Sequence, residues 1–195
     1  MKKLTKIIAL VLALVCICTA FAACGGNKDN KDKEKTPAVK VINYDLTSEQ
    51  YAFGVDKDQP ELLTKVNEIL KEMKSDGTFD AICNNNFGSG TPQAVKSAVL
   101  DKSKDQLIVA TNAEFEPFEY MKGENYYGVD MEMAAYIAKK LGKELVIKNM
   151  NFDAVCLSVG QHKCDIAMAG LTISEDRKEY VNFSDPYYEA SQRLI

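Results

Sequence analysis

Strand-like and helix-like segments alternate along residues 106–181, and this order restricts the fold of the chain more than any other feature. Short apolar runs predict strands, and longer runs with apolar residues on one side predict helices. The alternation requires right-handed crossovers and a mainly parallel sheet covered by helices. The expected elements are strands over 106–112, 144–150 and 165–170, helices over 129–142, 152–163 and 174–181, and a further strand that begins at residue 190.

The ends of these elements indicate where a ligand would bind. In an open α/β sheet, ligands lie beyond the carboxyl ends of the strands. "TNAEFEPF" follows the first expected strand, Phe152 follows the second, and "AGLTISEDR" follows the third. We also expect Asp130 to be the N-cap of helix 129–142 and Ser174 to be the N-cap of the short helix.

The first turn of the short helix contains Arg177, although a helix N-terminus favours negative charge. Glu175 and Asp176 fit that preference, and the arginine does not. The local sequence leaves two interpretations open. Arg177 either pairs with one of these acids or another surface acid, or it binds a carboxylate, for which a guanidinium and a helix N-terminus are both suited.

The segment before residue 93 contains fewer elements. "YAFGV" (51–55) is a candidate strand, and Pro60 begins a helix that ends at Asp76-Gly77. Residues 78–88 predict a short helical turn. These pieces cannot bury enough area to fold alone, so the segment must pack on the alternating part. The apolar residues that require a partner there are Leu62, Leu63, Val66, Ile69, Leu70 and Met73.

The N-terminus carries export signals. Three lysines within the first six residues precede an uncharged apolar run, which is typical of a signal peptide over residues 1–23. "TAFAAC" resembles the lipobox of bacterial lipoproteins, which implies that Cys24 is lipidated. The composition of residues 24–40 predicts a disordered tether. We therefore expect a lipid anchor on the extracytoplasmic face of the cell membrane.

Charge and cysteine content restrict the partners. Without the three lysines of the signal peptide, the 24 basic residues become 21, against 28 acidic residues, a net charge of −7. That sign does not match nucleic acid or anionic lipid, so we expect membrane contact through the lipid anchor only. The odd number of remaining cysteines, Cys83, Cys156 and Cys164, and their spacings predict no disulfide framework and no metal site. Cys156 and Cys164 lie at apolar positions, which is typical of buried free thiols. We expect His162, the only histidine, to be a solvated residue in a turn. The sequence contains no catalytic or phosphate-binding motif, so we expect no cofactor and no enzyme activity.

The motifs of residues 105–195, taken in order, strongly resemble the N-terminal lobe of the family 3 bacterial solute-binding proteins, the amino-acid receptors of ABC importers. They are the aromatic-Pro-Phe turn, the G-x-D helix start, the F-D-A helix, the D-I-A strand, and the T-I-S-E-D-R and F-S-D-P-Y-Y motifs. The resemblance implies an α/β fold, a type II periplasmic-binding-protein-like lobe with helices on both faces of a mainly parallel sheet.

The resemblance also implies a ligand site. Arg177 would bind the α-carboxylate of an amino acid, Thr172 would add hydroxyl and N–H donors, and the Gly170 carbonyl would accept from the ammonium. Asn112 reaches toward the side-chain end, where receptors for cationic ligands usually carry an aspartate, so it favours a neutral polar ligand. The other implied site residues are the walls Phe115 and Phe152, Phe118 packed beneath the turn, and Ala169 and Leu171.

Residues 46–88 resemble the C-terminal end of the same family, where a hinge strand and helices return to this lobe. The expected organisation is therefore a tail-like segment over 41–92, a linker over 93–104 and the ligand-binding lobe over 105–195, without a second lobe. Two interpretations remain open: a lobe completed by circular permutation, or the front of a longer protein. In either case we expect half of a two-lobed clamp, which by itself binds amino acids weakly.

The expected function is that of a monomeric substrate-binding lipoprotein that delivers a polar amino acid to an ABC permease and its ATPase. Two alternatives remain. A degenerate or permuted lobe could serve as a protein-interaction module. A few relatives of the family are cyclohexadienyl dehydratases, which add a catalytic acid to the same carboxylate clamp, and the sequence alone identifies no such acid.

Overall fold

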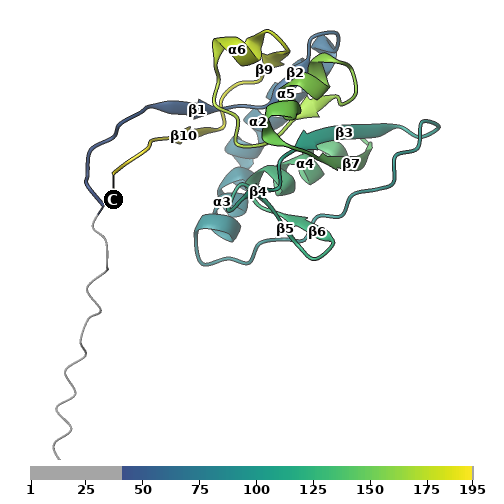
Figure 1. Cartoon of the computed structure of the whole chain (residues 1–195). Helices are drawn as coiled ribbons and strands as arrows, with labels where there is room; N and C mark the ends of the chain where they lie inside the picture. The colour runs from purple at the N-terminus through teal and green to yellow at the C-terminus, as the bar shows by residue number, and fades with distance from the viewer. Residues whose placement is uncertain (1–40, 195) are drawn as a thin grey trace, which may run out of the picture. The chain divides into compact units, whose positions relative to one another are not determined.

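The computed structural model describes residues 41–194, which belong to one compact unit (Figure 1). The predicted signal peptide, the predicted lipidation site Cys24 and the predicted tether lie outside the described residues. Within the described part of the chain, no helix combines the length and the apolar character that a membrane span requires.

The centre of the fold is a five-stranded sheet with the order β7-β3-β8-β2-β9. Strand β3 runs parallel to both β7 and β8, whereas β2 runs antiparallel to both β8 and β9. Four of the five strands therefore point the same way, and the predicted mainly parallel α/β sheet is confirmed. The strands are β2 (Gly54–Asp56), β3 (Gln106–Thr111), β7 (Glu144–Asn149), β8 (Ile166–Ala167) and β9 (Val181–Phe183).

Helices cover both faces of this sheet. Successive strand residues point to opposite faces, and the apolar clusters follow that rule. Val109 and Ile166 pack with the buried faces of α2 and α4, whereas Ala110 and Ala167 pack with α5. The helices are α2 (Pro60–Asp76), α3 (Thr78–Phe87), α4 (Val129–Lys140), α5 (Phe152–Gly160) and α6 (Glu175–Lys178).

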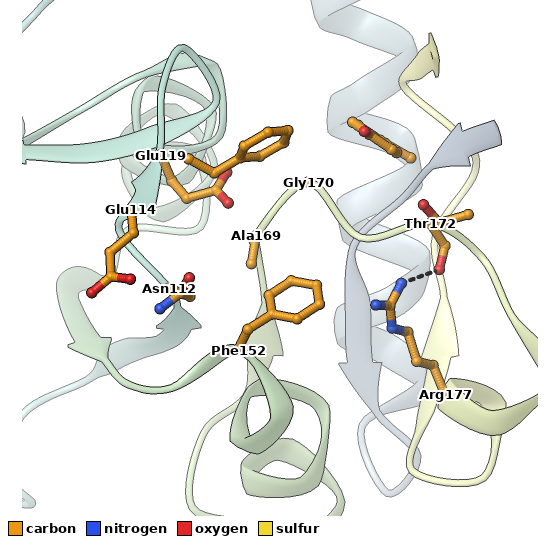
Figure 2. A pocket seen from close by; sticks show the side chains of 10 residues that line it. Asn112, Glu114, Glu119, Phe152, Ala169, Gly170, Thr172 and Arg177 are labelled. Carbon is orange, nitrogen blue, oxygen red and sulfur yellow. Dashed lines mark hydrogen bonds between the residues drawn. The ribbon is translucent and has the colours of Figure 1, made fainter. Parts of the chain in front are cut away.

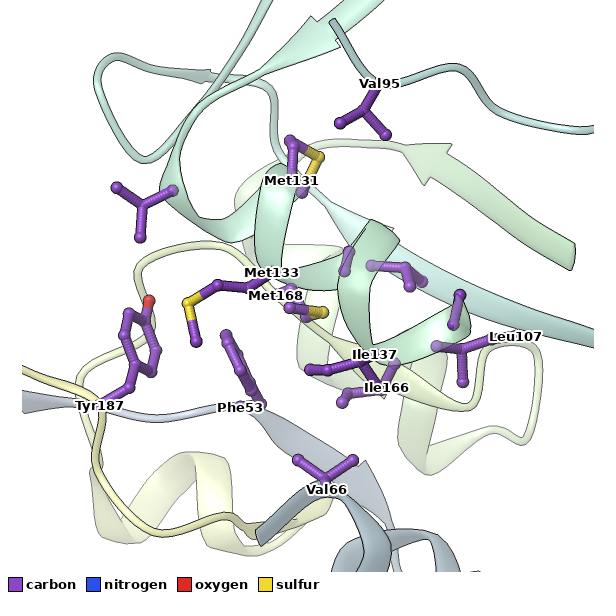
Figure 3. Packing of buried hydrophobic residues seen from close by; sticks show 14 of the residues in the cluster. Phe53, Val66, Val95, Leu107, Met131, Met133, Ile137, Ile166, Met168 and Tyr187 are labelled. Atoms are coloured by element: carbon purple, nitrogen blue, oxygen red, sulfur yellow. The ribbon is translucent and has the colours of Figure 1, made fainter. Parts of the chain in front are cut away.

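The part of the segment over 41–92 that lies between Tyr51 and Ile82 belongs to the same core (Figure 3). Strand β2 lies between β8 and β9, and Phe53 stacks on Tyr187 with ring centroids 4.5 Å apart. Helix α2 ends at Gly77, in a left-handed conformation with φ 83°, as the sequence predicts. Its buried side chains join the large apolar cluster, so the prediction that this segment packs on residues 105–195 is confirmed. These side chains are Val66, Ile69, Leu70 and Met73.

The predicted N-cap of α4 is wrong. Gly128 occupies that position with φ 114°, and Asp130 lies inside the first turn with its side chain fully buried. A Cβ atom on Gly128 would come within 2.2 Å of the Phe118 carbonyl oxygen, so only glycine fits this close approach. Asp130 instead accepts hydrogen bonds from the Gly170 N–H (2.9 Å) and the Tyr187 hydroxyl (2.6 Å).

Several short elements differ from the prediction. Residues 78–88 contain a ten-residue helix, α3. Strand β8 keeps only two of the six predicted residues, and the chain turns three residues later at Gly170, with φ 52°. A small antiparallel sheet, β4-β5-β6, was not predicted because its strands are too short to show a pattern. It comprises β4 (Glu114–Phe115), β5 (Glu119–Lys122) and β6 (Asn125–Tyr127).

The strand predicted from residue 190 is misplaced, because β10 (Tyr188–Ala190) ends at that residue and residues 191–194 form no strand. Strand β10 pairs antiparallel with β1 (Glu49–Tyr51). The pairing continues beyond these strands, since the Ile42 N–H donates to the Leu194 carbonyl and the Leu46 N–H donates to the Gln192 carbonyl, both at 2.8 Å. Segments at opposite ends of the described chain therefore run side by side as a two-stranded ribbon (Figure 1).

Candidate functional site

A cavity of about 400 Å³ lies where the sequence predicts a ligand site. It forms beyond the carboxyl ends of β3 and β8 and beside the first residue of α5 (Figure 2). The predicted site residues that line it are Asn112, Phe115, Phe152, Ala169, Gly170, Thr172 and Arg177. Tyr51, Glu114 and Glu119 also line it and were not predicted.

Two predicted site residues do not line the cavity. Phe118 is only 6% exposed and stacks beneath Phe115, with ring centroids 5.3 Å apart, as expected of a residue packed under the turn. Leu171 is 1% exposed and belongs to the apolar cluster beneath α5. Both side chains therefore support the wall of the cavity from behind.

Arg177 is held in place by two contacts. Its Nη1 donates to the Thr172 carbonyl oxygen over 2.7 Å, and its guanidinium carbon lies 5.0 Å from the ring centroid of Phe152. Within residues 41–194, no carboxylate forms an ion pair with it, and the neighbouring Glu175 pairs with Lys178. The surface ion-pair interpretation is therefore wrong. A guanidinium has five N–H donors, and the contact with Thr172 leaves donors free for a ligand.

Ser174 is the N-cap of α6, as predicted, and its hydroxyl accepts from the Arg177 N–H at 3.4 Å. The predicted hydroxyl donor at Thr172 is engaged elsewhere. Thr172 Oγ1 donates to Glu49 Oε2 over 2.9 Å, and this hydrogen bond is the main cause of a lowered pKa at Glu49, with Arg177 adding to the effect. Glu49 is therefore ionised at neutral pH beside the arginine end of the cavity.

The opposite side of the cavity carries acids (Figure 2). Glu114, Glu119 and Asn112 lie on that side, whereas Arg177 and Thr172 lie on the other. The Asn112 side-chain amide donates to the Met150 carbonyl oxygen at 2.9 Å, which fixes its orientation. The cavity thus has a cationic end and an acidic end, separated by aromatic walls.

Residues 107–195 match the model of the bacterial extracellular solute-binding proteins, family 3. This part of the chain belongs to that family. The arginine-binding extracellular protein ArtP of Bacillus subtilis (strain 168) is 36% identical over 95 residues, which are 49% of this chain and 37% of ArtP. The cyclohexadienyl dehydratase of Pseudomonas aeruginosa is 35% identical over 82 residues, 42% of this chain and 31% of that protein.

Among solved structures, the arginine-bound form of domain 1 from TmArgBP is 36% identical to this chain. The match covers 49% of this chain and 86% of that domain, with a TM-score of 0.43. The chain spans about 37% of the length of ArtP, so it corresponds to part of such a relative. Of the residues that line the cavity, Tyr51 lies outside the family 3 segment.

Glu119 is the least expected residue of the family 3 cavity. Its side chain is 1% exposed, and Oε2 has no hydrogen-bond partner within the described residues. Burial, together with the charge of Asp130, raises the pKa of Glu119 to about 11. Burial likewise raises the pKa of Asp130 to about 6, against the opposing effect of its two hydrogen bonds. The sequence signal for Glu119 is its place at the end of the aromatic turn "EFEPFE", directly beside the aromatic residues that predict the walls of the site.

Proposed function

We propose that this chain binds a cationic α-amino acid. One observation carries the proposal: Arg177 and a pair of glutamates, Glu114 and Glu119, lie on opposite sides of one cavity of about 400 Å³. The guanidinium suits the α-carboxylate of the ligand, because it offers a fork of N–H donors in the geometry of a carboxylate. The glutamates suit a cation at the far end of the ligand side chain.

The walls of the cavity support the same ligand class. Phe115 and Phe152 are 43% and 39% exposed, so each has apolar surface available to a ligand in the cavity. The aliphatic part of a long cationic side chain would pack on these rings. The relatives named as arginine-binding agree with this assignment. The two acids therefore outweigh Asn112, which by itself favours a neutral ligand.

We further propose that the chain acts as the substrate-binding component of an ABC importer, with an ABC permease and its ATPase as partners. Family 3 relatives that carry such names support this role. The N-terminal sequence supports a lipid anchor at Cys24 on the extracytoplasmic face of the membrane. The participation of β2, α2 and Tyr51 in the core and the cavity supports residues 41–92 as a functional part of the lobe.

One observation favours a second function. Cyclohexadienyl dehydratases belong among the relatives, and Glu119 is a protonated acid inside the cavity, the kind of group that a dehydration requires. Glu114 on the same side favours the binding function, because a second carboxylate there disfavours an anionic ring substrate. Incubation with prephenate and arogenate, followed by detection of the aromatic products, distinguishes the dehydratase function from the binding function. We expect no turnover.

The binding function is tested by titrating the purified chain with L-arginine and following the amide resonances of Gly170 and Thr172. We expect saturable shifts for L-arginine and their loss in Arg177→Ala. Ser75→Ala, on the exposed side of α2, is the matched control. The loss expected in Arg177→Ala is about tenfold or more, since hydrogen bonds to charged groups contribute about 1.5–3 kcal/mol. Unchanged affinity in Arg177→Ala contradicts the assignment of the carboxylate end.

A further inference from the structure

Two buried carboxyl groups, those of Glu119 and Asp130, interact with one another beside the cavity. Glu119 lines the cavity, and Asp130 lies fully buried behind Gly170, whose N–H it accepts at 2.9 Å. The Asp130 N–H donates to the Phe118 carbonyl oxygen at 2.9 Å, which fixes the start of α4 beside the residue that precedes Glu119. The two acids interact electrostatically because they share this small, dehydrated region.

Hydrogen bonds make the two acids unequal. Asp130 accepts from the Gly170 N–H and from the Tyr187 hydroxyl, and both bonds favour its ionised form. Oε2 of Glu119 accepts from no group within residues 41–194. Because two adjacent buried charges repel each other, the pair holds one negative charge and one proton at neutral pH. These hydrogen bonds favour the charge on Asp130 and the proton on Glu119.

The groups around Glu119 do not supply a cation. Asp130 faces it from α4, while Tyr51 from β1 and Tyr187 from the segment before β10 interact with the same pair of charges. Glu114 lies on the same side of the cavity, and Arg177 lies across it, engaged with Thr172 and Phe152. A ligand is therefore the natural source of a positive charge next to Glu119.

We propose that a cationic ligand enters this cavity in exchange for the proton of Glu119, so that the buried Glu119–Asp130 pair makes binding proton-coupled and selective for a charged side chain. The inference rests on the proposed function and adds its regulation by protons. The O–H bond of Glu119 breaks heterolytically, the proton leaves to water or buffer, and the remaining carboxylate pairs with the cation of the ligand. No electrons are transferred.

The sign of the pH dependence follows from this exchange. The free protein holds the Glu119 proton, because burial places its pKa at about 11, and the ligand complex does not. Binding therefore releases about one proton, and the dissociation constant for L-arginine should fall by up to about tenfold for each pH unit between pH 6.5 and 8.5. L-citrulline has nearly the shape of L-arginine and a neutral side-chain end. Its dissociation constant should be nearly independent of pH in the same range.

The test uses purified protein with carbon-13 labelled carboxyl groups. The carboxyl resonance of Glu119, assigned with Glu119→Gln, reports its protonation in the free protein and with L-arginine or L-citrulline at up to tens of millimolar. Calorimetry in two buffers of different ionisation enthalpy counts the protons released. We expect Glu119 to be protonated at pH 7.5 in the free protein and with L-citrulline, and ionised with L-arginine. Glu119→Gln should bind L-arginine about tenfold or more weakly, retain L-citrulline and release no proton.

Glu114→Gln is the matched control, since it removes an exposed carboxylate from the same side of the cavity. It should weaken L-arginine binding while the release of about one proton persists. A Glu119 that is already ionised at pH 7.5 in the free protein overturns the inference whether or not a ligand binds. Binding of L-arginine to a Glu119 that stays protonated overturns the inference and leaves the proposed function intact. Failure of every amino acid to bind overturns the proposed function, and the inference with it.

Discussion

Thr172 and Glu49, 123 residues apart in the sequence, are joined by a hydrogen bond of 2.9 Å from the threonine hydroxyl to Oε2 of the glutamate. The bond connects the arginine end of the cavity with β1, which belongs to the segment over 41–92. Glu49 also accepts from Thr47 and from Gln192. An ionised carboxylate from a distant part of the sequence therefore holds a donor that the ligand carboxylate would otherwise use.

Glu49→Gln should increase the affinity for L-arginine by about two- to fivefold, because it removes a negative charge near the site of the ligand carboxylate. This increase in affinity should be smaller at high salt, because salt screens the interaction between the two charges. Asp45→Asn is the control, since Asp45 lies on the same ribbon and pairs with Arg193. Both variants can be titrated at 20 mM and 500 mM salt. A lower affinity in Glu49→Gln would show that Glu49 orients Thr172 for the ligand and does not oppose it.

Gly170→Ala should destabilise the fold by about 1 kcal/mol or more and weaken ligand binding. Gly170 has φ 52°, which disfavours a side chain, and a Cβ atom there would lie 3.0 Å from a ring carbon of Phe115. Gly123→Ala is the control, because Gly123 has φ 62° and nothing within 4 Å of an added Cβ. Urea unfolding measures the stability of both variants. An equal loss of stability in the two variants would mean that the Phe115 ring moves away from the added methyl group without an energetic penalty.

Met73→Ala should lower the free energy of unfolding by about 2–5 kcal/mol, as expected when a fully buried methionine is truncated. The Met73 side chain is 0% exposed and packs in the large apolar cluster of the sheet. Lys71→Ala, at an exposed position of α2, should change the stability by less than about 0.5 kcal/mol. Chemical denaturation compares the two variants. A small effect of Met73→Ala would indicate that α2 contributes little to the core.

The contribution of His162 to stability should be larger at low pH. His162 Nδ1 lies 2.8 Å from Oδ2 of the buried Asp56, and this hydrogen bond is the main cause of a raised pKa at His162. A raised histidine pKa gives stability that is fully present below about pH 6.5, the ordinary value, and is lost as the pH rises through the folded-state value.

His162→Asn is suited to test this, because His162 has φ 57° and asparagine tolerates that conformation. The difference in melting temperature between the native protein and this variant should be larger at pH 5.5 than at pH 8.5. The same comparison with Lys163→Ala, the next residue, is the control. A difference that grows with pH would contradict the assigned sign.

Cys24→Ala should release the protein from membranes, because small residues precede Cys24 and a polar segment follows it. Fractionation of cells that express either form, followed by detection in membranes and medium, measures the effect. Substitution of Cys83 should leave the distribution unchanged. Membrane association that persists in Cys24→Ala would contradict the lipobox assignment.

The long elements could be predicted because their signals are local, whereas the position of Arg177 at the cavity was predicted from the order of the strand ends and from the resemblance to family 3. The buried face of α2 repeats with helical spacing, and Arg177 follows a recognisable cap and strand end. The acidic end could not be predicted in the same way. Glu119 turns inward in a three-stranded sheet of two- to four-residue strands, whose lengths show no periodicity.

The contributions of Tyr51 and Asp130 depend on tertiary contacts. Tyr51 reaches the cavity through pairing with Tyr188 and a bridge to Thr172, which joins residues more than 100 positions apart. Asp130 has the chemistry of an N-cap, but the close approach of Gly128 to the Phe118 carbonyl moves the cap to the glycine. At both positions the structure is determined by tertiary packing and not by the conformational preference of the local sequence.

The ribbon of β1 and β10 has a consequence for the cavity. Its two strands are linked by backbone hydrogen bonds along their length, and the pairing extends from Tyr51 and Tyr188 out to Ile42 and Leu194. At its inner end, Tyr51 is paired with Tyr188 on one side and bridged to Thr172 on the other, and its ring lines the cavity. The ribbon therefore connects the outer pairs, such as Ile42 with Leu194, to the wall of the cavity through Tyr51, so a ligand in the cavity would contact the inner end of a structure that extends away from the lobe.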